Sequence, residues 1–181
     1  MNIIKPLSFL FATSLFILLA SCNNTPSLQR YFVDHQEAAN FITQDIPISV
    51  LNIDQTRLTE AQKEAYKSVS RLNFLGYRAT SQNTDSLKAE LTTVKAILSQ
   101  DQYNDLIEFS DKGNRIELKY IGTDDKAEEV VLFGSSPDKG FGIVRVLGND
   151  MTPKKIITLV EVLQNSNIEK EQLEGIFNFF K

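Results

Sequence analysis

The sequence is short of the side chains on which most enzymes rely. Its 181 residues include one cysteine, one histidine and no tryptophan. One histidine and one cysteine cannot assemble a zinc site of the usual nitrogen and sulfur ligands. A Ser-His-Asp triad could use only His35, and no Gly-x-Ser-x-Gly segment is present to expose a serine. His35 stands near Asp34 and Glu37 in a weakly patterned stretch, which favours a surface histidine over a general base.

Basic residues are also few, and they form no runs. Lysine and arginine total 19 against 23 aspartates and glutamates, so the formal net charge is −4. Nucleic-acid-binding proteins normally carry a basic patch, and electrostatic attraction to anionic lipid needs a polybasic segment. The charge pattern therefore argues against nucleic acid as a partner.

No apolar run is long enough to span a membrane, but one has the length expected in an export signal. Residues 7–19 form a mostly apolar stretch of about 13 residues, against the ~20 that a spanning helix needs. Lys5 precedes this stretch, and the small residues Ala20 and Ser21 follow it, directly before Cys22. This order predicts a signal peptide over residues 1–21.

The segment Leu19-Ala20-Ser21-Cys22 resembles the lipobox of bacterial lipoproteins, in which the cysteine thiol is acylated and cleavage occurs before it. Cys22 has two other interpretations, a buried core cysteine and one half of an intermolecular disulfide. The first is disfavoured because the preceding residues form a cleavable signal. We expect Cys22 to carry fatty acyl chains such as palmitate, each buried CH₂ of which contributes about 0.8 kcal/mol to membrane binding.

Cleavage would leave 160 residues, the size of one ordinary domain, with 18 basic and 23 acidic residues. We expect residues 22–29 to be the lipidated cysteine and a short polar tether, and residues 30–181 to form the domain. No acidic pair follows Cys22, which favours an anchor in the outer membrane that faces the periplasm.

Local patterns predict several helices. Thr59 with Gln62, and Ser99 with Gln102, have the spacing of capping boxes. Apolar side chains at helical spacing follow Thr84, Thr152 and Ser166. The predicted helices cover residues 59–67, 84–98, 99–107, 153–163 and 166–180.

Alternating apolar side chains predict four strands. They cover residues 70–77, 115–120, 129–133 and 141–147. Turn residues link the last three, which are therefore expected to form an antiparallel meander. The predicted fold is a single α+β domain, with a four-stranded, mainly antiparallel sheet packed against amphipathic helices.

The second face of this sheet also carries apolar side chains, namely Leu75, Tyr77, Ile143 and Leu147. One interpretation is that the segment Leu28–Asp54, predicted as a short helix or extended arm, covers this face. The other is that the four side chains form a surface for a partner, since uncovered apolar patches usually mark binding sites.

Acidic residues crowd one predicted hairpin, but their spacing does not match a calcium loop. Asp101, Asp105 and Glu108 share a face of the predicted helix over residues 99–107, which is typical of a solvent-facing side. We therefore expect no metal and no cofactor. The hairpin acids are Asp124, Asp125, Glu128 and Glu129.

Three segments carry a resemblance to a known family: FITQDIPISVLNID (41–54), LTEAQKEAYKSVSRLNFLGYRA (58–79) and GIVRVLGND (142–150). They resemble a family of small lipoproteins from Bacteroidetes that is known only as a domain of unknown function. The resemblance covers about residues 31–163 and brings no catalytic residues with it. It implies a setting in the envelope stress response, because genes of this family are thought to lie near stress-type sigma factors.

The sequence thus favours a non-enzymatic lipoprotein that binds an envelope protein or component through a sheet face. An alternative is a carboxylate-dependent hydrolase or small-ligand-binding enzyme, which would need two acids in a deep pocket. A third possibility is a purely structural spacer.

Overall fold

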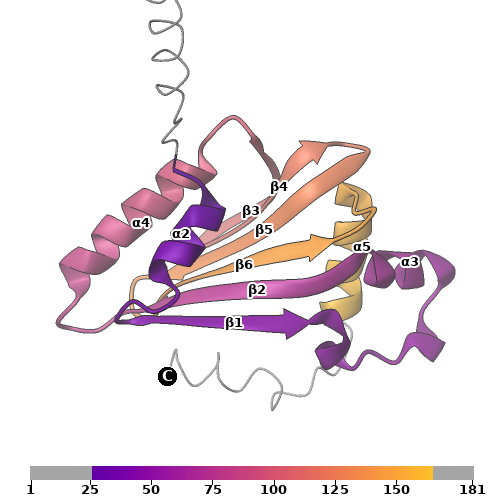
Figure 1. Ribbon diagram of the computed structural model, residues 1–181, viewed down its shortest axis with the longest axis horizontal. Helices are drawn as coiled ribbons and strands as arrows, with labels where there is room; N and C mark the ends of the chain where they lie inside the picture. The colour runs from indigo at the N-terminus through magenta and orange to yellow at the C-terminus, as the bar shows by residue number, and fades with distance from the viewer. Residues whose placement is uncertain (1–25, 165–181) are drawn as a thin grey trace, which may run out of the picture.

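The computed structural model describes residues 26–164, which form a single α+β domain around one antiparallel sheet (Figure 1). The sheet has six strands in the order β1-β2-β6-β5-β4-β3. The expectation of an α+β domain is therefore confirmed, and that of a four-stranded sheet is wrong. The strands are β1 (Phe41–Pro47), β2 (Val69–Arg78), β3 (Tyr103–Asp111), β4 (Asn114–Thr123), β5 (Lys126–Ser136) and β6 (Gly140–Gly148).

Both additional strands lie at the edges of the sheet. β1 comes from the weakly patterned segment before residue 54, and pairs with β2 from Phe41 to Pro47. β3 replaces the helix predicted over residues 99–107. It pairs with β4 through a turn at Lys112 and Gly113, both of which have positive φ angles of 49° and 85°. Cross-strand hydrogen bonds outweigh the weak helical pattern there, because short apolar runs suit either structure.

The four predicted strands are present, and the last three form the expected antiparallel meander of β4, β5 and β6. β2 pairs antiparallel with both β1 and β6. It therefore joins the meander to the N-terminal edge strand.

Four α-helices accompany the sheet within the described part of the chain. The Thr59–Gln62 capping box is confirmed, with Thr59 Oγ1 accepting from Gln62 N at 3.3 Å and Gln62 Oε1 accepting from Thr59 N at 3.0 Å. Ser99 ends a helix instead of starting one, and the helix predicted from Ser166 lies outside the described residues. The helices are α2 (Leu28–His35), α3 (Glu60–Ser68), α4 (Thr84–Leu98) and α5 (Pro153–Gln164), with 3₁₀ turns η2 (Ile48–Leu51) and η3 (Gln55–Arg57).

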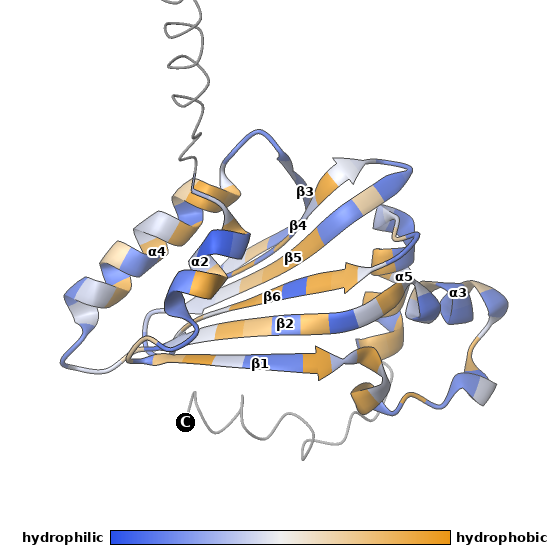
Figure 2. Ribbon diagram, viewed as in Figure 1, coloured by the Kyte–Doolittle hydropathy of each residue, from blue (hydrophilic) through white to orange (hydrophobic). Residues whose placement is uncertain are grey.

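One face of the sheet, here called the α4 face, packs against α2 and α4. Val94 and Ile97 of α4 and Leu28 of α2 are almost fully buried there. They contact a continuous set of sheet side chains. Figure 2 shows that apolar residues occur along the strands of the sheet. These sheet residues are Leu75, Tyr77, Val131, Phe133, Phe141 and Ile143.

The opposite face, here called the α5 face, packs against α3 and α5. Ala65 of α3 and Leu159 of α5 are buried against Leu118, Val130 and Val146 of the sheet. Figure 1 shows α3 and α5 together at one end of the sheet, while α2 and α4 lie toward the other. The helices of residues 26–164 therefore cover only part of the α5 face.

Candidate interaction surface

Four large apolar side chains are exposed on the uncovered part of the α5 face. They are Ile107 and Phe109 of β3, Ile116 of β4 and Leu132 of β5, with 40%, 57%, 46% and 39% of their surfaces accessible. Phe109 on β3 pairs with Ile116 on β4. Ile107 on β3 pairs with Leu118 on β4, which in turn pairs with Leu132 on β5. Because partners in register point to the same side of a sheet, the four side chains form one patch. We call it the exposed strip.

A furrow in the same face continues from the exposed strip toward β2. Gly76, Gly142 and Gly134 lie side by side on three neighbouring strands, since Gly142 pairs with both of the others. A Cβ atom added to Gly134 would meet no atom within 4 Å. The row of three glycines therefore leaves open space above Gly134, whereas Gly76 at its other end is buried. We call this row the glycine furrow.

Gly134 and Gly142 of the glycine furrow, with Ile116 and Leu132 of the exposed strip, line a hollow of about 390 Å³. Phe74, Ile116, Leu132 and Val144 provide apolar walls, while polar groups stand around it. The two charged side chains among the lining residues are Arg115 and Lys139. This chemistry suits the binding of an apolar group. The polar or charged lining side chains are Asn114, Arg115, Ser135, Ser136 and Lys139.

The partner surface expected from sequence lies on the α4 face, where it is covered. Leu75, Tyr77 and Ile143 are 0%, 2% and 0% exposed, so a partner cannot reach them; Leu147 is partly exposed. The segment Leu28–Asp54 does contribute α2 to this cover, and α4 contributes the rest. The expected surface is therefore mostly core, and the exposed apolar face is the opposite one.

Cys22 lies outside the described residues, so the anchor stays a prediction. Within residues 26–164, no helix combines the length and the apolar character needed to cross a bilayer.

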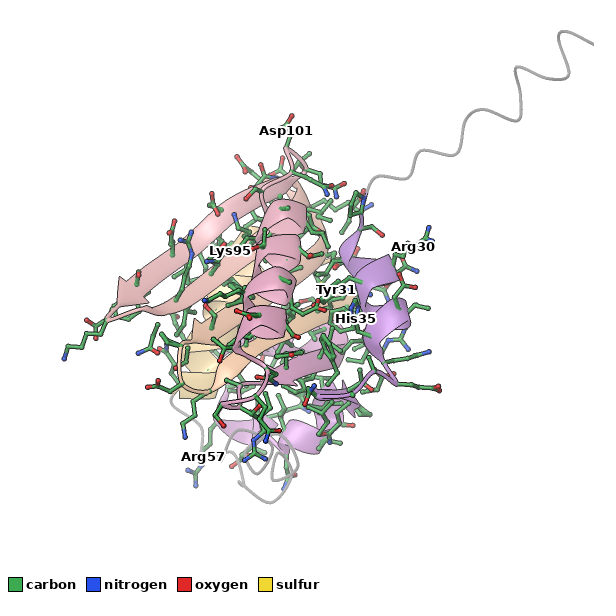
Figure 3. The ribbon with its side chains drawn as sticks, turned by 90° about the vertical axis from the view of Figure 1, so that its left-hand side faces the viewer. Arg30, Tyr31, His35, Arg57, Lys95 and Asp101 are labelled. Carbon is green, nitrogen blue, oxygen red and sulfur yellow. The ribbon has the colours of Figure 1, made fainter. Side chains whose placement is uncertain are left out.

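His35 is less exposed than its sequence context suggests. It is the last residue of α2, and its side chain lies beside Tyr31 and faces α4 (Figure 3). Its Nδ1 donates to the Tyr31 carbonyl oxygen at 2.8 Å, and its Nε2 lies 3.5 Å from Glu90 Oε2. The Tyr31 hydroxyl donates to the same Glu90 oxygen at 2.6 Å. Burial, and then this carboxylate, raise the pKa of Tyr31 far above its ordinary value. The cluster therefore joins α2 to α4 through the hydrogen bond from the Tyr31 hydroxyl to Glu90.

A second polar region lies on the α4 face near the end of α4. Within the described residues it is the arrangement most similar to an active site built from carboxylates. Glu117 and Lys119 are buried there, beside a hollow of about 570 Å³. Lys119 contacts both Asp105 and Glu117, and Arg115 contacts Glu117 and, at 2.9 Å, Glu108. Three carboxylates thus share two basic groups, an arrangement typical of an ion-pair network. Asp105 and Glu108 lie on β3, and not on the predicted helix.

Two of the four acidic hairpin residues, Glu129 and Asp124, make separate contacts. Arg145 Nε and Nη2 donate to the two carboxylate oxygens of Glu129 at 2.7 and 2.8 Å, while Asp124 accepts from the Tyr120 hydroxyl at 2.7 Å. Across the part of the chain that the structure describes, no three acidic, histidine or cysteine side chains are grouped to hold a metal ion.

These features define a small α+β protein in which, within residues 26–164, one sheet face carries exposed apolar side chains. The chain belongs to the family described as Domain of unknown function (DUF4252), whose model matches residues 32–159. The match runs from α2 into α5 and so includes all six strands. No curated protein and no solved structure matches the chain. The resemblance to a family of unknown function is therefore confirmed.

Proposed function

We propose that this protein is a Bacteroidetes lipoprotein, anchored by an acylated Cys22 to the periplasmic side of the outer membrane. It acts as a non-enzymatic interaction module of the cell envelope. Its exposed strip binds an apolar polypeptide segment of another envelope protein. The observation that carries the proposal is the grouping of four large, exposed apolar side chains on one sheet face, because monomeric soluble proteins rarely leave such patches without a partner.

The position of the exposed strip favours a polypeptide as the partner. Ile107 and Phe109 occur at alternate positions on β3, which is an edge strand of the sheet. Free backbone N–H and C=O groups on an edge strand can pair with an added strand, whose alternate side chains then contact the exposed patch. An apolar segment of another protein can satisfy both the backbone and the side chains, which a lipid chain cannot.

The short tether would hold this surface close to the membrane. Gln100 Nε2 donates to the Pro26 carbonyl oxygen at 2.7 Å, which ties the chain to the domain at residue 26. Four residue steps separate Cys22 from Pro26, and an extended chain covers at most about 3.5 Å per step, or roughly 14 Å. A partner would therefore be embedded in the same membrane or bound directly at its surface.

Replacing the anchoring cysteine is expected to release the protein from the membrane. In a host that matures lipoproteins, the Cys22→Ser variant should lose incorporation of an alkyne-labelled fatty acid and move from the membrane to the soluble periplasmic fraction. The multiply acylated wild type is held by the burial of its CH₂ groups and should stay in the membrane. Equal labelling of both proteins, or a wild type without label, would contradict the anchor.

A photoreactive amino acid at Ile116 is expected to crosslink the lipoprotein to one envelope protein in living cells. Phe109→Asp should abolish this product, because it places a charge in the exposed strip, whereas Phe109→Leu should keep it. The same photoreactive group at Val33, which is 59% exposed but lies on α2 over the other face, serves as the positional control. The measurement is the pattern of crosslinked bands identified by mass spectrometry.

Two outcomes would overturn the proposed binding surface. In the first, positions Ile116 and Val33 give the same products, which would reflect random collisions. In the second, the Ile116 product persists undiminished in the Phe109→Asp variant, which would place the contact elsewhere.

A further inference from the structure

The α4 face carries a polar groove beside α2, on the opposite side of the sheet from the exposed strip. The floor of the groove is a row of three residues on β1, β2 and β6, because Asn73 pairs with both Asp45 and Arg145. Asn73 and Arg145 lie two positions from Leu75 and Ile143, which are buried on the α4 face, so their side chains point to that face. The hollow above this floor has a volume of about 330 Å³. We call it the α2 groove.

One side of α2 forms the wall of the α2 groove. Tyr31 and His35 project from another side of the helix and contact Glu90 of α4. This contact fixes the rotation of α2 about its axis, and so determines which of its side chains line the groove. Four residues with the i, i+3, i+4, i+7 spacing of one helix face do so, namely Gln29, Phe32, Val33 and Gln36.

The charges of the α2 groove are balanced within the protein. The guanidinium of Arg145 donates hydrogen bonds of 2.7 and 2.8 Å to Glu129, and it lies 5.4 Å from the ring centre of Phe32. The carboxylate of Asp45 accepts from Nδ2 of Asn73. An anionic ligand would gain little from an arginine that already has its counter-charge. A cationic ligand would gain little from Asp45, because this exposed carboxylate is screened by solvent. The groove therefore favours an uncharged ligand.

The other polar groups of the α2 groove are suited to binding hydroxyl groups. The carboxamides of Gln29, Gln36 and Asn73 each provide both donors and an acceptor, and the hydroxyl of Thr43 also does both. A sugar hydroxyl likewise donates one hydrogen bond and accepts others, so such groups can bind neighbouring hydroxyls without leaving either side unpaired. Phe32 adds an apolar surface for the C–H groups of a sugar ring.

We propose that the α2 groove binds a saccharide, with one or two units of an oligosaccharide held between α2 and the polar floor. Ligand pockets have volumes of roughly 300–1,000 Å³, and the α2 groove lies at the lower end of this range, which suits a ligand of that size. The α2 groove and the exposed strip occupy opposite faces of the sheet. The inference therefore does not rest on the proposed function, and both sites can be occupied at once.

NMR titration of the mature Cys22→Ser chain tests this site, because the side-chain NH₂ groups of asparagine and glutamine give signals of their own. The probes are three uncharged trisaccharides, namely maltotriose, cellotriose and tri-N-acetylchitotriose. At least one of them should shift the side-chain signals of Gln29, Gln36 or Asn73 along a saturable curve, with a dissociation constant of about 1 mM or below. The absence of saturable shifts with all three would overturn the proposal.

Replacing one glutamine of the wall separates specific binding from general effects of the sugar on the protein. Gln36→Ala should weaken binding of the same trisaccharide about fivefold, because it removes a donor and an acceptor from the groove. Gln82→Ala is the matched control, since Gln82 is also exposed but precedes α4 and does not line the groove, and it should leave the dissociation constant unchanged. Equal dissociation constants for the two variants would overturn the assignment of the site.

An uncharged peptide tests the class of ligand. Acetyl-trialanine amide offers backbone donors and acceptors but no sugar ring, and it should bind at least about tenfold more weakly than the best trisaccharide. A peptide that shifts the same signals at lower concentrations than every trisaccharide would overturn the assignment to saccharides. Neither result would alter crosslinking from Ile116 to an envelope partner, so failure of this inference is distinguishable from failure of the proposed function.

Discussion

The Phe133→Ala variant is expected to lose about 3–5 kcal/mol of unfolding free energy, which is a large part of the stability of a domain of this size. Phe133 is on β5 and fully buried in the α4 face, with its ring centroid 6.3 Å from that of Phe141. Its removal leaves a cavity between the sheet and the helices, which neighbouring side chains can fill only in part. Urea denaturation followed by circular dichroism should show a lower midpoint with an unchanged slope.

The adjacent residue is the matched control for this experiment. Leu132 lies on the same strand but points to the α5 face, where 39% of its surface is exposed. Leu132→Ala should therefore cost about 1 kcal/mol or less, because little buried surface is lost. Equal losses of unfolding free energy in Phe133→Ala and Leu132→Ala would show that the two faces of the sheet are not covered as described.

Arg145→Met is expected to cost about 3 kcal/mol, because it leaves the carboxylate of Glu129 without its partner in a poorly solvated site. The side chains of Arg145 and Glu129 are only 12% and 17% exposed. The guanidinium donates two hydrogen bonds to the carboxylate and stacks 5.4 Å from the ring centre of Phe32 on α2. Hydrogen bonding to Glu129 raises the pKa of Arg145 above its ordinary value, so the guanidinium stays charged.

The double variant Arg145→Met with Glu129→Leu separates the unpaired charge from the loss of packing. It should recover most of the lost stability, since an apolar pair of similar volume often replaces a buried ion pair without cost. Chemical denaturation of the wild type, both single variants and the double variant gives the coupling free energy between the two residues. A double variant as unstable as Arg145→Met alone would refute this account of the pair.

Helix starts were predictable because their chemistry is local. Thr59 and Gln62 bond to each other's backbone across three residues, so the sequence alone indicates where α3 begins. The same holds for Thr152, whose Oγ1 accepts from Lys155 N at 3.1 Å at the start of α5. Ser99 and Gln102 have the same spacing but do not start a helix, because Ser99 is the residue that caps the C-terminus of α4.

The edge strands were not predictable in the same way. Residues 103–111 carry Leu106 and Ile107 side by side, and the strand β3 accommodates them with an irregularity between Asp105 and Ile107. Whether such a segment becomes helix or strand depends on hydrogen bonds to β4, which residues inside the segment do not encode. The same argument applies to β1, which is a strand because β2 offers it a free edge.

Which apolar face of the sheet is exposed depends on where the helices pack, and the alternation of apolar residues does not show this. Alternation showed that Leu75 and Ile143 share one face and that both faces of the sheet are apolar. It did not show which face α4 would cover, because a helix can cross to either side after its connecting loop. Since α4 packs over Leu75 and Ile143, the exposed residues are Ile116 and its neighbours on the other face.

Local patterns along the chain were enough to predict an α+β composition, four of the six strands, the helix starts with local caps, and membership of a family defined along the chain. The two edge strands, the burial of the expected partner surface and the position of the exposed strip became visible only in the folded protein. The physical reason is range: caps and alternation involve residues within a few positions of each other, whereas strand pairing and the cover of a sheet face depend on segments tens of residues apart.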